Sequence, residues 1–455
     1  MQQQPSAEIQ AMLLDALRFH REGRLDDAER LYRAILSIDP GHADSLHLLG
    51  MIAFQIGHHE NAVELIRKAI AINGSAASYH SNLGNVLQSQ RKLAEAGACY
   101  QRALVLKPDL AQVWVNLGNI FKAQRDIDSS LTCYRRALTI NPELAEAAAG
   151  ESMALLLSGD FASGWARFDR RWQTKDFNTP MRAYRQPLWK GERLASGHLL
   201  VWGEQGIGDE IMFAGLIPEV IATGNRPVLD CDARLNSLFA RSFPGADIVS
   251  GLDPESRPEL EIAAHLPAGS LPRLFRATAA AFSSTTSPYL VADAAERQQF
   301  RARYDDGRKL VGLAWYTKNK TTGIGRSIDL ATLAPLFSIP GIQWISLQYG
   351  DHDALESELA GTPVVVDRTV DQFADIDLFA AQVAAMDLVI TIDNSAAHLA
   401  GALGVPTWLL LPYAPDWRWM LDRDDSPWYP TMRLFRQATP GDWQGVVQSV
   451  QRALG

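Results

Sequence analysis

This sequence has few cysteines, no excess of positive charge and no long apolar segments. Its three cysteines are odd in number and lie far apart, which favours a reducing compartment and provides neither a disulfide framework nor a set of metal ligands. The formal net charge of −9 argues against nucleic acid or an anionic membrane as the main partner, because phosphate groups attract basic surfaces. No apolar run reaches the roughly 18 residues that span a bilayer, so we expect no membrane insertion.

The remaining composition is that of an ordinary globular protein. Apolar residues make up 47% and charged residues 21% of the chain, both close to average. A chain of 455 residues exceeds what one hydrophobic core accommodates, so we expect about two to four domains. The segment from Met1 to Glu8 lacks the basic and apolar stretches of a secretory signal, and we therefore expect a cytoplasmic protein.

A 34-residue period runs through the first third of the chain. Gly50, Gly84 and Gly118 are spaced by 34 residues, a leucine precedes each of them, and further small and aromatic positions keep the same period. The pattern resembles the tetratricopeptide repeat, whose units are helix pairs that pack through small residues. We expect a solenoid of such repeats with a concave groove over residues 1–150, followed by a degenerate helical repeat and linker over 151–194.

Paired asparagines follow the same period. Asn82 and Asn85 in one repeat recur as Asn116 and Asn119 in the next. Asparagine is a poor helix former, and its recurrence at first-helix positions predicts that these amides face the groove and clamp the backbone of a protein acceptor. The alternative is a solvated surface that binds nothing.

The segment from Asp387 to Pro406 has the order strand, polar loop and helix. It opens with a β-branched run of the kind buried in parallel sheets, and Asn394 or Ser395 is placed to cap the helix that follows. The free N–H groups and positive end of that helix favour an anion, so we expect a nucleotide-phosphate site that includes Asp393 and His398. The alternative is an ordinary strand-to-helix turn in which His398 is a hydrogen-bonded, half-buried side chain.

A second strand-to-helix turn lies at Gly203–Gly208. It follows the apolar run Leu199–Trp202 and leads into a helix. The turn does not match the glycine-rich motif that binds dinucleotides, because Ile211 occupies the place of the third glycine. Asp209 lies where ligands bind beside the carboxyl ends of parallel strands, so it is a candidate general base for an acceptor hydroxyl. Its alternative role is helix capping.

Both turns resemble signatures of the bacterial lipopolysaccharide heptosyltransferases, through Gly208-Asp209 with Pro218 in the first and Asp393 to Pro406 in the second. Further segments resemble the bacterial family in which tetratricopeptide repeats are fused to such a glycosyltransferase-like domain; these are Gly159 to Trp165, Glu204 to Asp209, Ser346 to Gln348 and Asp416 to Trp419.

The resemblance implies a GT-B architecture, so the expected fold class is an α-solenoid followed by a pair of Rossmann-like α/β domains. Residues 195–305 would form the acceptor-side domain and residues 306–455 the domain that binds a nucleotide-sugar. The family implies no obligatory metal.

Positive charge for a leaving diphosphate is expected in the loop that follows the strand at 310–315. Lys318, Lys320 and Arg326 gather there, and they would stabilise the developing charge together with Ser395, His398 and backbone N–H groups. Basic loops of this kind are also commonly just solvated.

Two further sets of residues have alternative interpretations. Gln348 ends the strand that contains Trp344 and is a candidate for a nucleobase or ribose pocket, although a turn explains it nearly as well. Four large aromatic residues near the C-terminus would either stack on a sugar or, as we favour, belong to the hydrophobic core; they are Trp417, Trp419, Trp428 and Tyr429.

Together these features predict a cytoplasmic, metal-independent, inverting glycosyltransferase that moves a sugar from a nucleotide-sugar donor to a protein hydroxyl. The repeats would hold the protein acceptor, for which the family resemblance makes flagellin or another surface protein a candidate. The nucleotide-sugar is a co-substrate, and no other cofactor is expected. One alternative is a non-catalytic repeat scaffold with a degenerate transferase domain, and another is a transferase that acts on a saccharide.

Overall fold

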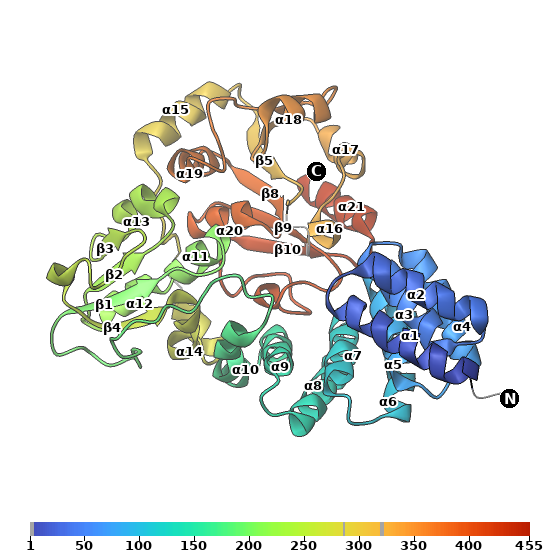
Figure 1. Ribbon diagram of the computed structural model, residues 1–455. Helices are drawn as coiled ribbons and strands as arrows, with labels where there is room; N and C mark the ends of the chain where they lie inside the picture. Colours follow the sequence, from blue (N-terminus) through green and yellow to red (C-terminus); the bar gives the residue numbers. More distant parts are fainter. Residues whose placement is uncertain (1–3, 285–286, 319–322) are drawn as a thin grey trace. The chain divides into compact units, whose positions relative to one another are not determined.

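The computed structural model describes residues 4–284, 287–318 and 323–455 (Figure 1). It divides into two compact units, Met1–Glu151 and Ser152–Gly455, which we call the repeat unit and the α/β unit. Within the described ranges, no helix combines the length and apolarity needed to cross a bilayer.

The repeat unit consists of helix pairs joined by short loops, and each helix packs against the next. The helices are α1 (Gln4–Arg21), α2 (Leu25–Ile38), α3 (Ala43–Gln55), α4 (His59–Ile72), α5 (Ala77–Ser89), α6 (Leu93–Leu106), α7 (Ala111–Ala123) and α8 (Ile127–Ile140). The first half of α9 (Ala145–Ser158) completes the unit.

Close helix contacts explain the 34-residue glycine period. A Cβ atom on Gly84 in α5 would lie 2.5 Å from the ring of Tyr100 in α6, and one on Gly118 in α7 would lie 2.8 Å from the ring of Tyr134 in α8. Both tyrosines are fully buried. Each glycine therefore makes room for the aromatic residue of its own repeat, and a larger side chain would push the two helices apart.

The α/β unit begins with the second half of α9, α10 (Phe161–Phe168) and the short helix η1 (Asp169–Gln173). Its first sheet contains four parallel strands in the order β3-β2-β1-β4. The elements of this part are β1 (His198–Trp202), α11 (Ile207–Ala214), α12 (Ile217–Ala222), β2 (Pro227–Asp230), η2 (Ala233–Leu235), α13 (Asn236–Ser242), β3 (Asp247–Val249), η3 (Pro258–Leu260), β4 (Ile262–Pro267), η4 (Ala268–Ser270), α14 (Pro272–Phe275) and η5 (Ala279–Ser284).

The second sheet contains six parallel strands in the order β10-β9-β8-β5-β6-β7. The elements here are α15 (Ala294–Tyr304), β5 (Lys309–Ala314), α16 (Gly323–Arg326), α17 (Leu330–Phe337), β6 (Ile342–Ser346), α18 (His352–Glu358), β7 (Val364–Val365), α19 (Ile376–Ala384), β8 (Leu388–Ile392), α20 (Ser395–Ala402), β9 (Thr407–Leu411), η6 (Trp417–Trp419), β10 (Met432–Arg436) and α21 (Trp443–Leu454).

The predicted fold class is confirmed. Tetratricopeptide repeats precede two parallel-sheet domains, consistent with a Rossmann-like pair. The β-branched run predicted as a buried strand is β8, and all five of its residues are buried. Such continuous apolar strands are typical of parallel sheets that are covered on both faces.

The two sheets of the α/β unit are joined through the helices that follow their central strands. In Figure 1, α11 (green) lies beside α20 (red-orange), and the two helices pack together. The hydroxyl of Tyr289 donates to the carbonyl of Ile211 in α11 at 2.9 Å, while its backbone N–H donates to the carbonyl of Ala402 in α20 at 3.1 Å. Arg241 and Asp377 form a bidentate ion pair at 2.7 Å. Tyr289 therefore links the middle of α11 to the last residue of α20, and the ion pair links α13 to α19.

The glycine contacts yield a paired prediction. Gly84→Ala should lower the stability of the repeat unit by about 1 kcal/mol or more, because overpacking against Tyr100 exceeds the gain in helix propensity. Gly97→Ala in α6 is the matched control: its Cβ would meet Ile120 at an ordinary 3.4 Å, so stability should stay the same or rise by up to about 1 kcal/mol. Urea midpoints of the full chain, followed by circular dichroism, measure both effects. Equal changes in the two variants would refute this packing explanation.

Candidate functional site

The start of helix α11 lies against the start of helix α20. Helix α11 follows β1 of the first sheet, and α20 follows β8 of the second. A Cβ atom on Gly208 would lie 3.0 Å from Cδ2 of His398 and 3.5 Å from Cα of Ser395, so the two helix starts approach closely and a larger residue at this position would press on the His398 ring. Because helix starts have unpaired N–H groups and a positive dipole end, their meeting point favours an anion.

Asp209 is the third residue of α11, and both of its carboxylate oxygens have partners. Oδ2 accepts the N–H of Gly206 at 3.3 Å, which is the capping interaction considered from the sequence. Oδ1 pairs with Nη2 of Arg418, in the segment that follows β9 of the other sheet. Asp209 thus caps its helix and also forms an ion pair between the two sheet domains.

Arg418 is the functional candidate that sequence reasoning missed. Its Nη1 pairs with Asp416 at 2.7 Å, and its guanidinium carbon lies 4.4 Å from the centre of the Trp417 ring. The side chain is only 11% exposed, and its Nε is buried without a hydrogen-bond partner within the described part of the chain. The only sequence signal was its place in the Asp416 to Trp419 segment.

A second ion pair lies beside the first. Asp393, directly after β8, accepts a hydrogen bond from Nη1 of Arg326 at 2.8 Å. Burial raises the pKa of Asp393 more strongly than Arg326 lowers it. For Asp416, burial also acts to raise the pKa, but Arg418 and Arg326 outweigh it and hold this pKa below its ordinary value.

His398 is fixed by aromatic residues. Its Nδ1 lies 2.8 Å from the hydroxyl of Tyr429, and its ring stacks on Trp419 with centroids 5.3 Å apart. Burial, reinforced by Arg418, lowers the pKa of His398 to about 3, so the imidazole is neutral at physiological pH. Because Nδ1 is turned toward Tyr429, the opposite ring edge is turned toward Gly208.

The predicted core assignment of the C-terminal aromatics is confirmed, since all four are at most 5% exposed. Two of them also position the candidate site, because Trp419 and Tyr429 hold the His398 ring. The remaining pair contributes to an aromatic cluster around Trp165, in which Trp417 and Trp428 make edge contacts.

Asn394 caps α20, as one of the two predicted alternatives. Its Oδ1 accepts the N–H of Ala397 at 3.2 Å and the hydroxyl of Thr391 at 3.1 Å. Its Nδ2 is buried without a partner among the residues described, so it is a donor that a ligand oxygen would satisfy. Ser395, the first residue of the helix, is partly exposed beside it.

The other predicted donor-binding residues lie in different surroundings. Lys318 is exposed, and its ammonium lies 5.7 Å from the centre of the Tyr349 ring; Lys320 falls outside the described residues. Gln348 is fully buried, and its Oε1 accepts the N–H groups of Trp315 and Tyr316 at 3.0 Å each. Gln348 therefore joins the ends of β5 and β6, and its side-chain oxygen is engaged by backbone N–H groups.

The charged groups of the site nearly balance one another. Three carboxylates stand against two guanidinium groups, because His398 is neutral; they are Asp209, Asp393 and Asp416 with Arg326 and Arg418. An incoming phosphate must therefore compete with carboxylates for the arginines. Across the described ranges, no three histidine, cysteine or acidic side chains are grouped so as to hold a metal ion.

In the repeat unit, the four predicted asparagines are half-buried and bonded to neighbours. The Asn116 amide donates to Oδ1 of Asn85 at 3.0 Å, and the Asn82 amide lies 2.9 Å from Nε2 of His47, so both connect successive repeats. Asn85 and Asn119 also accept the hydroxyls of tyrosines in their own repeats. The amides thus form a row along the first helices, but they are less exposed than the sequence interpretation assumed.

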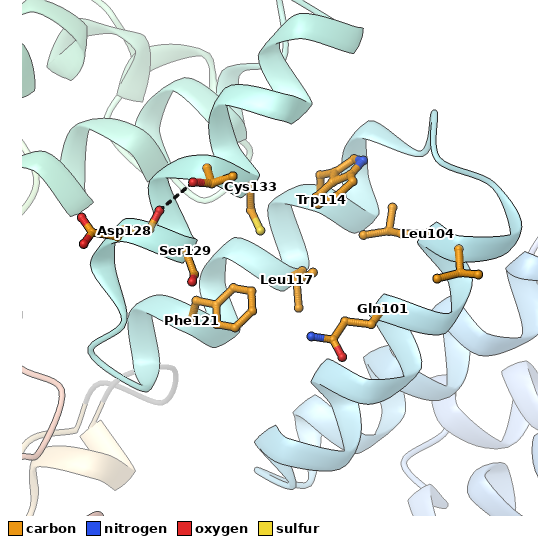
Figure 2. A pocket seen from close by; sticks show the side chains of 10 residues that line it. Gln101, Leu104, Trp114, Leu117, Phe121, Asp128, Ser129 and Cys133 are labelled. Atoms are coloured by element: carbon orange, nitrogen blue, oxygen red, sulfur yellow. Dashed lines mark hydrogen bonds between the residues drawn. The ribbon is translucent and has the colours of Figure 1, made fainter.

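An apolar groove opens elsewhere in the repeat unit. Figure 2 shows Trp114, Leu117 and Phe121 of α7 between side chains of α6 and α8, around a cavity of about 520 Å³. One repeat earlier, Arg67 of α4 and Glu95 of α6 form an ion pair at 2.9 Å. The corresponding positions 34 residues later are Gln101 and Ser129, which line the cavity and form no ion pair. The groove therefore lacks, at these two positions, the ion pair of the preceding repeat.

Comparisons with known proteins identify the repeats directly. Two family models match, both described as tetratricopeptide repeat, over residues 19–85 and 74–143. Among solved structures, MamA is similar with a TM-score of 0.32 and 22% identity over 34% of this chain and 91% of that one. A structure of Pseudomonas aeruginosa pilF has a TM-score of 0.35 and 21% identity over 37% of this chain and 78% of its own.

Protein FlbA of Caulobacter vibrioides is similar over a longer range. It is 30% identical over 327 residues, which cover 66% of this chain and 53% of FlbA; the chain therefore spans about half the length of that protein. Since the repeat unit ends at Glu151 of 455 residues, the match includes part of the α/β unit. Human tetratricopeptide repeat protein 7B is 36% identical over 78 residues, or 17% of this chain and 9% of that protein.

The burial of neutral His398 leads to a pH-dependent prediction. Its pKa is depressed to about 3 in the folded protein, so below about pH 6.5 only the unfolded chain takes up this proton, and stability falls as the pH falls. His398→Gln removes the group and should weaken that dependence by about 2 kcal/mol between pH 7 and pH 5. Denaturant unfolding of both full-length proteins at these pH values measures the difference. Parallel pH dependences in the two proteins would mean that His398 is protonated in the folded state.

Proposed function

We propose that the α/β unit is a GT-B-type glycosyltransferase that moves a sugar from a nucleotide-sugar donor to a hydroxyl group of a protein. The observation that carries the proposal is the meeting of two helix starts from separate parallel sheets, with Asp209 on one and Ser395 and His398 on the other. Ligands of parallel α/β sheets bind at the carboxyl ends of the strands. This point therefore lies where a phosphate-linked substrate would bind.

The residues divide into two chemical roles. Backbone N–H groups at the start of α20, the Ser395 hydroxyl and the Arg326 guanidinium would bind the donor phosphates and stabilise the charge that develops as the nucleotide leaves. Asp209 would take the proton of the acceptor hydroxyl. The hydroxyl oxygen would attack the anomeric carbon of the sugar as the bond between that carbon and the donor phosphate oxygen breaks. A single displacement of this kind inverts the anomeric centre. The protein groups supply the positive charge, so the reaction is proposed to be metal-independent.

The repeat unit would supply the acceptor. Solenoids of tetratricopeptide repeats present extended surfaces that bind proteins, and the asparagine row has amide groups with spare hydrogen-bonding capacity. We propose that it binds an extended protein segment in the cytoplasm, with flagellin or another surface protein as the candidate acceptor. A saccharide acceptor would leave the repeats without a role in the reaction.

A non-catalytic scaffold is the second candidate, and one observation favours it. The arginines of the site are both paired with carboxylates, Arg326 with Asp393 and Arg418 with Asp209 and Asp416. A site that no longer binds a ligand would also keep its arginines paired with carboxylates in this way. Nucleotide binding separates the two candidates, because only the transferase needs it.

The first prediction of the proposal concerns binding and chemistry at Asp209. A nucleoside mono- or diphosphate should raise the melting temperature of the full chain, since a ligand at about 100 times its Kd adds roughly 2.7 kcal/mol. Asp209→Asn should retain or enlarge this shift but lower sugar-transfer turnover by a factor of about 10² to 10⁴. Thermal-shift screening and a radiolabelled-sugar assay measure the two effects.

The matched control is Asp293→Asn, because Asp293 also caps a helix and lies 4.0 Å from an arginine, Arg241, outside the site. It should leave turnover unchanged. Full turnover in Asp209→Asn would remove Asp209 from the mechanism, and a chain that no nucleotide stabilises would support the scaffold. Loss of activity with EDTA and recovery with Mn²⁺ would contradict the metal-independent reaction.

The second prediction locates the acceptor surface. Asn82→Ala with Asn116→Ala removes two amides of the row and leaves the tyrosine hydroxyl bonds of Asn85 and Asn119 intact. The affinity for purified flagellin from the same organism should fall about tenfold if two hydrogen bonds to a peptide are lost, while nucleotide affinity should not change. Calorimetry with both ligands measures the separation.

A groove-closing variant is the comparison for this experiment. Gln101→Arg with Ser129→Glu recreates the ion pair that Arg67 and Glu95 form one repeat earlier, and it should leave flagellin affinity unchanged. If flagellin affinity fell only in this variant, the acceptor would bind in the apolar groove and not at the asparagine row. Unchanged affinity in both variants would place the acceptor outside the repeats or identify it as another molecule.

A further inference from the structure

We propose that Arg418 couples donor binding to the release of the base. Without donor it holds the Asp209 carboxylate; when donor phosphate binds, Nη2 of Arg418 turns to the phosphate and leaves Asp209 free to accept a proton. The inference rests on the proposed function and adds an order of substrate binding, in which the donor binds before the acceptor reacts. Arg418 would then contact the donor phosphate and, by leaving Asp209, make the base available.

The first support is the way Arg418 occupies the base. A general base needs an accessible lone pair on the reacting oxygen. In this structure, Arg418 pairs with Oδ1 of Asp209, and the N–H of Gly206 approaches Oδ2. Each of these hydrogen bonds occupies a lone pair of the carboxylate, and the one from the charged guanidinium is the stronger of the two. Asp209 is therefore restrained as long as this ion pair persists.

The second support is that Arg418 can exchange one partner and keep its place. Its Nη1 is held by Asp416 at 2.7 Å, and its planar group lies over Trp417. A guanidinium has five N–H donors in a fixed plane, and Nε of Arg418 is buried without a partner in the described structure. An anion beside it would gain hydrogen bonds without displacing Asp416.

The third support is the position of the cluster beside the helix starts. Arg418 is close enough to His398 and Asp393 to influence the protonation of both, and His398 contacts the start of α11 at Gly208. A phosphate at this point would therefore lie beside Arg418 as well as the helix N–H groups. Since Arg418 comes from the second sheet domain and Asp209 from the first, the exchange would also break an ion pair between the domains.

The test is a double-mutant cycle on anion binding to the full chain. The probes are inorganic pyrophosphate and the nucleoside phosphate that gives the largest thermal shift. If Asp209 competes with phosphate for Arg418, Asp209→Asn should tighten binding about tenfold in the wild-type background. In the Arg418→Gln background the same change should have less than about a threefold effect, because the shared partner is gone.

Arg418→Lys is the second variant, because Arg418→Gln leaves Asp416 without its partner and risks misfolding. A lysine retains one charge for Asp416 but lacks the fork that serves a second anion. In this background, too, Asp209→Asn should have less than about a threefold effect. Melting temperatures and circular dichroism of all variants establish that they are folded.

The outcomes separate this inference from the proposed function. Asp209→Asn could tighten anion binding equally in the wild-type and Arg418-variant backgrounds. This result would mean that Asp209 and the phosphate do not compete for Arg418, and it would overturn the inference while leaving the proposed transferase function intact. Absence of binding of pyrophosphate and every nucleotide to the wild-type chain would overturn both. If the Arg418–Asp209 ion pair were purely structural, the Arg418 variants would be less stable. The effect of Asp209→Asn on anion affinity would then not depend on Arg418, and the inference would be overturned.

Discussion

The contact between the starts of α11 and α20 at Gly208 is the constraint on which the candidate site depends. Two positive helix ends approach each other there, and a Cβ atom on Gly208 would lie only 3.0 Å from the His398 ring. Such an approach is electrostatically unfavourable unless negative charge lies nearby. The carboxylates of Asp209, Asp393 and Asp416 supply that charge in this structure, and we propose that a donor phosphate takes over part of this role.

The surrounding structure maintains this contact. Tyr289 bonds to the backbone of both helices, while Trp419 and Tyr429 hold His398 in one orientation. Burial keeps His398 neutral, which avoids adding a third cation beside Arg326 and Arg418. The His398 ring is therefore already oriented, whereas under our proposal the Arg418 side chain turns when an anion binds.

Much of the fold followed from local patterns in the sequence. The glycine period identified the repeats because Gly84 and Gly118 adjoin tyrosines of their own repeats, which is a local contact at fixed spacing. The run before Asp393 identified β8, and capping chemistry identified Asn394. The difference between successive repeats at Gln101 and Ser129 is also visible in the sequence, because the equivalent positions one repeat earlier are Arg67 and Glu95.

The site contacts were less accessible to sequence reasoning because they join distant segments. Arg418 meets Asp209 across 209 residues of chain, and no local pattern specifies such a pair. Gln348 has the polar character of a ligand contact, yet it is fully buried against backbone N–H groups. The asparagine row was recognised by its period, but its bonds to His47 and to the tyrosines depend on how successive helices pack.

The most direct test of the central claim is a crystal structure of the full chain with the nucleoside phosphate that stabilises it most. The account predicts phosphate oxygens within about 3 Å of the backbone N–H groups of Ser395 and Ala396, beside Gly208, with Arg418 turned from Asp209 toward the phosphate. Phosphates bound at any other place, with the pair between Arg418 and Asp209 intact, would contradict it.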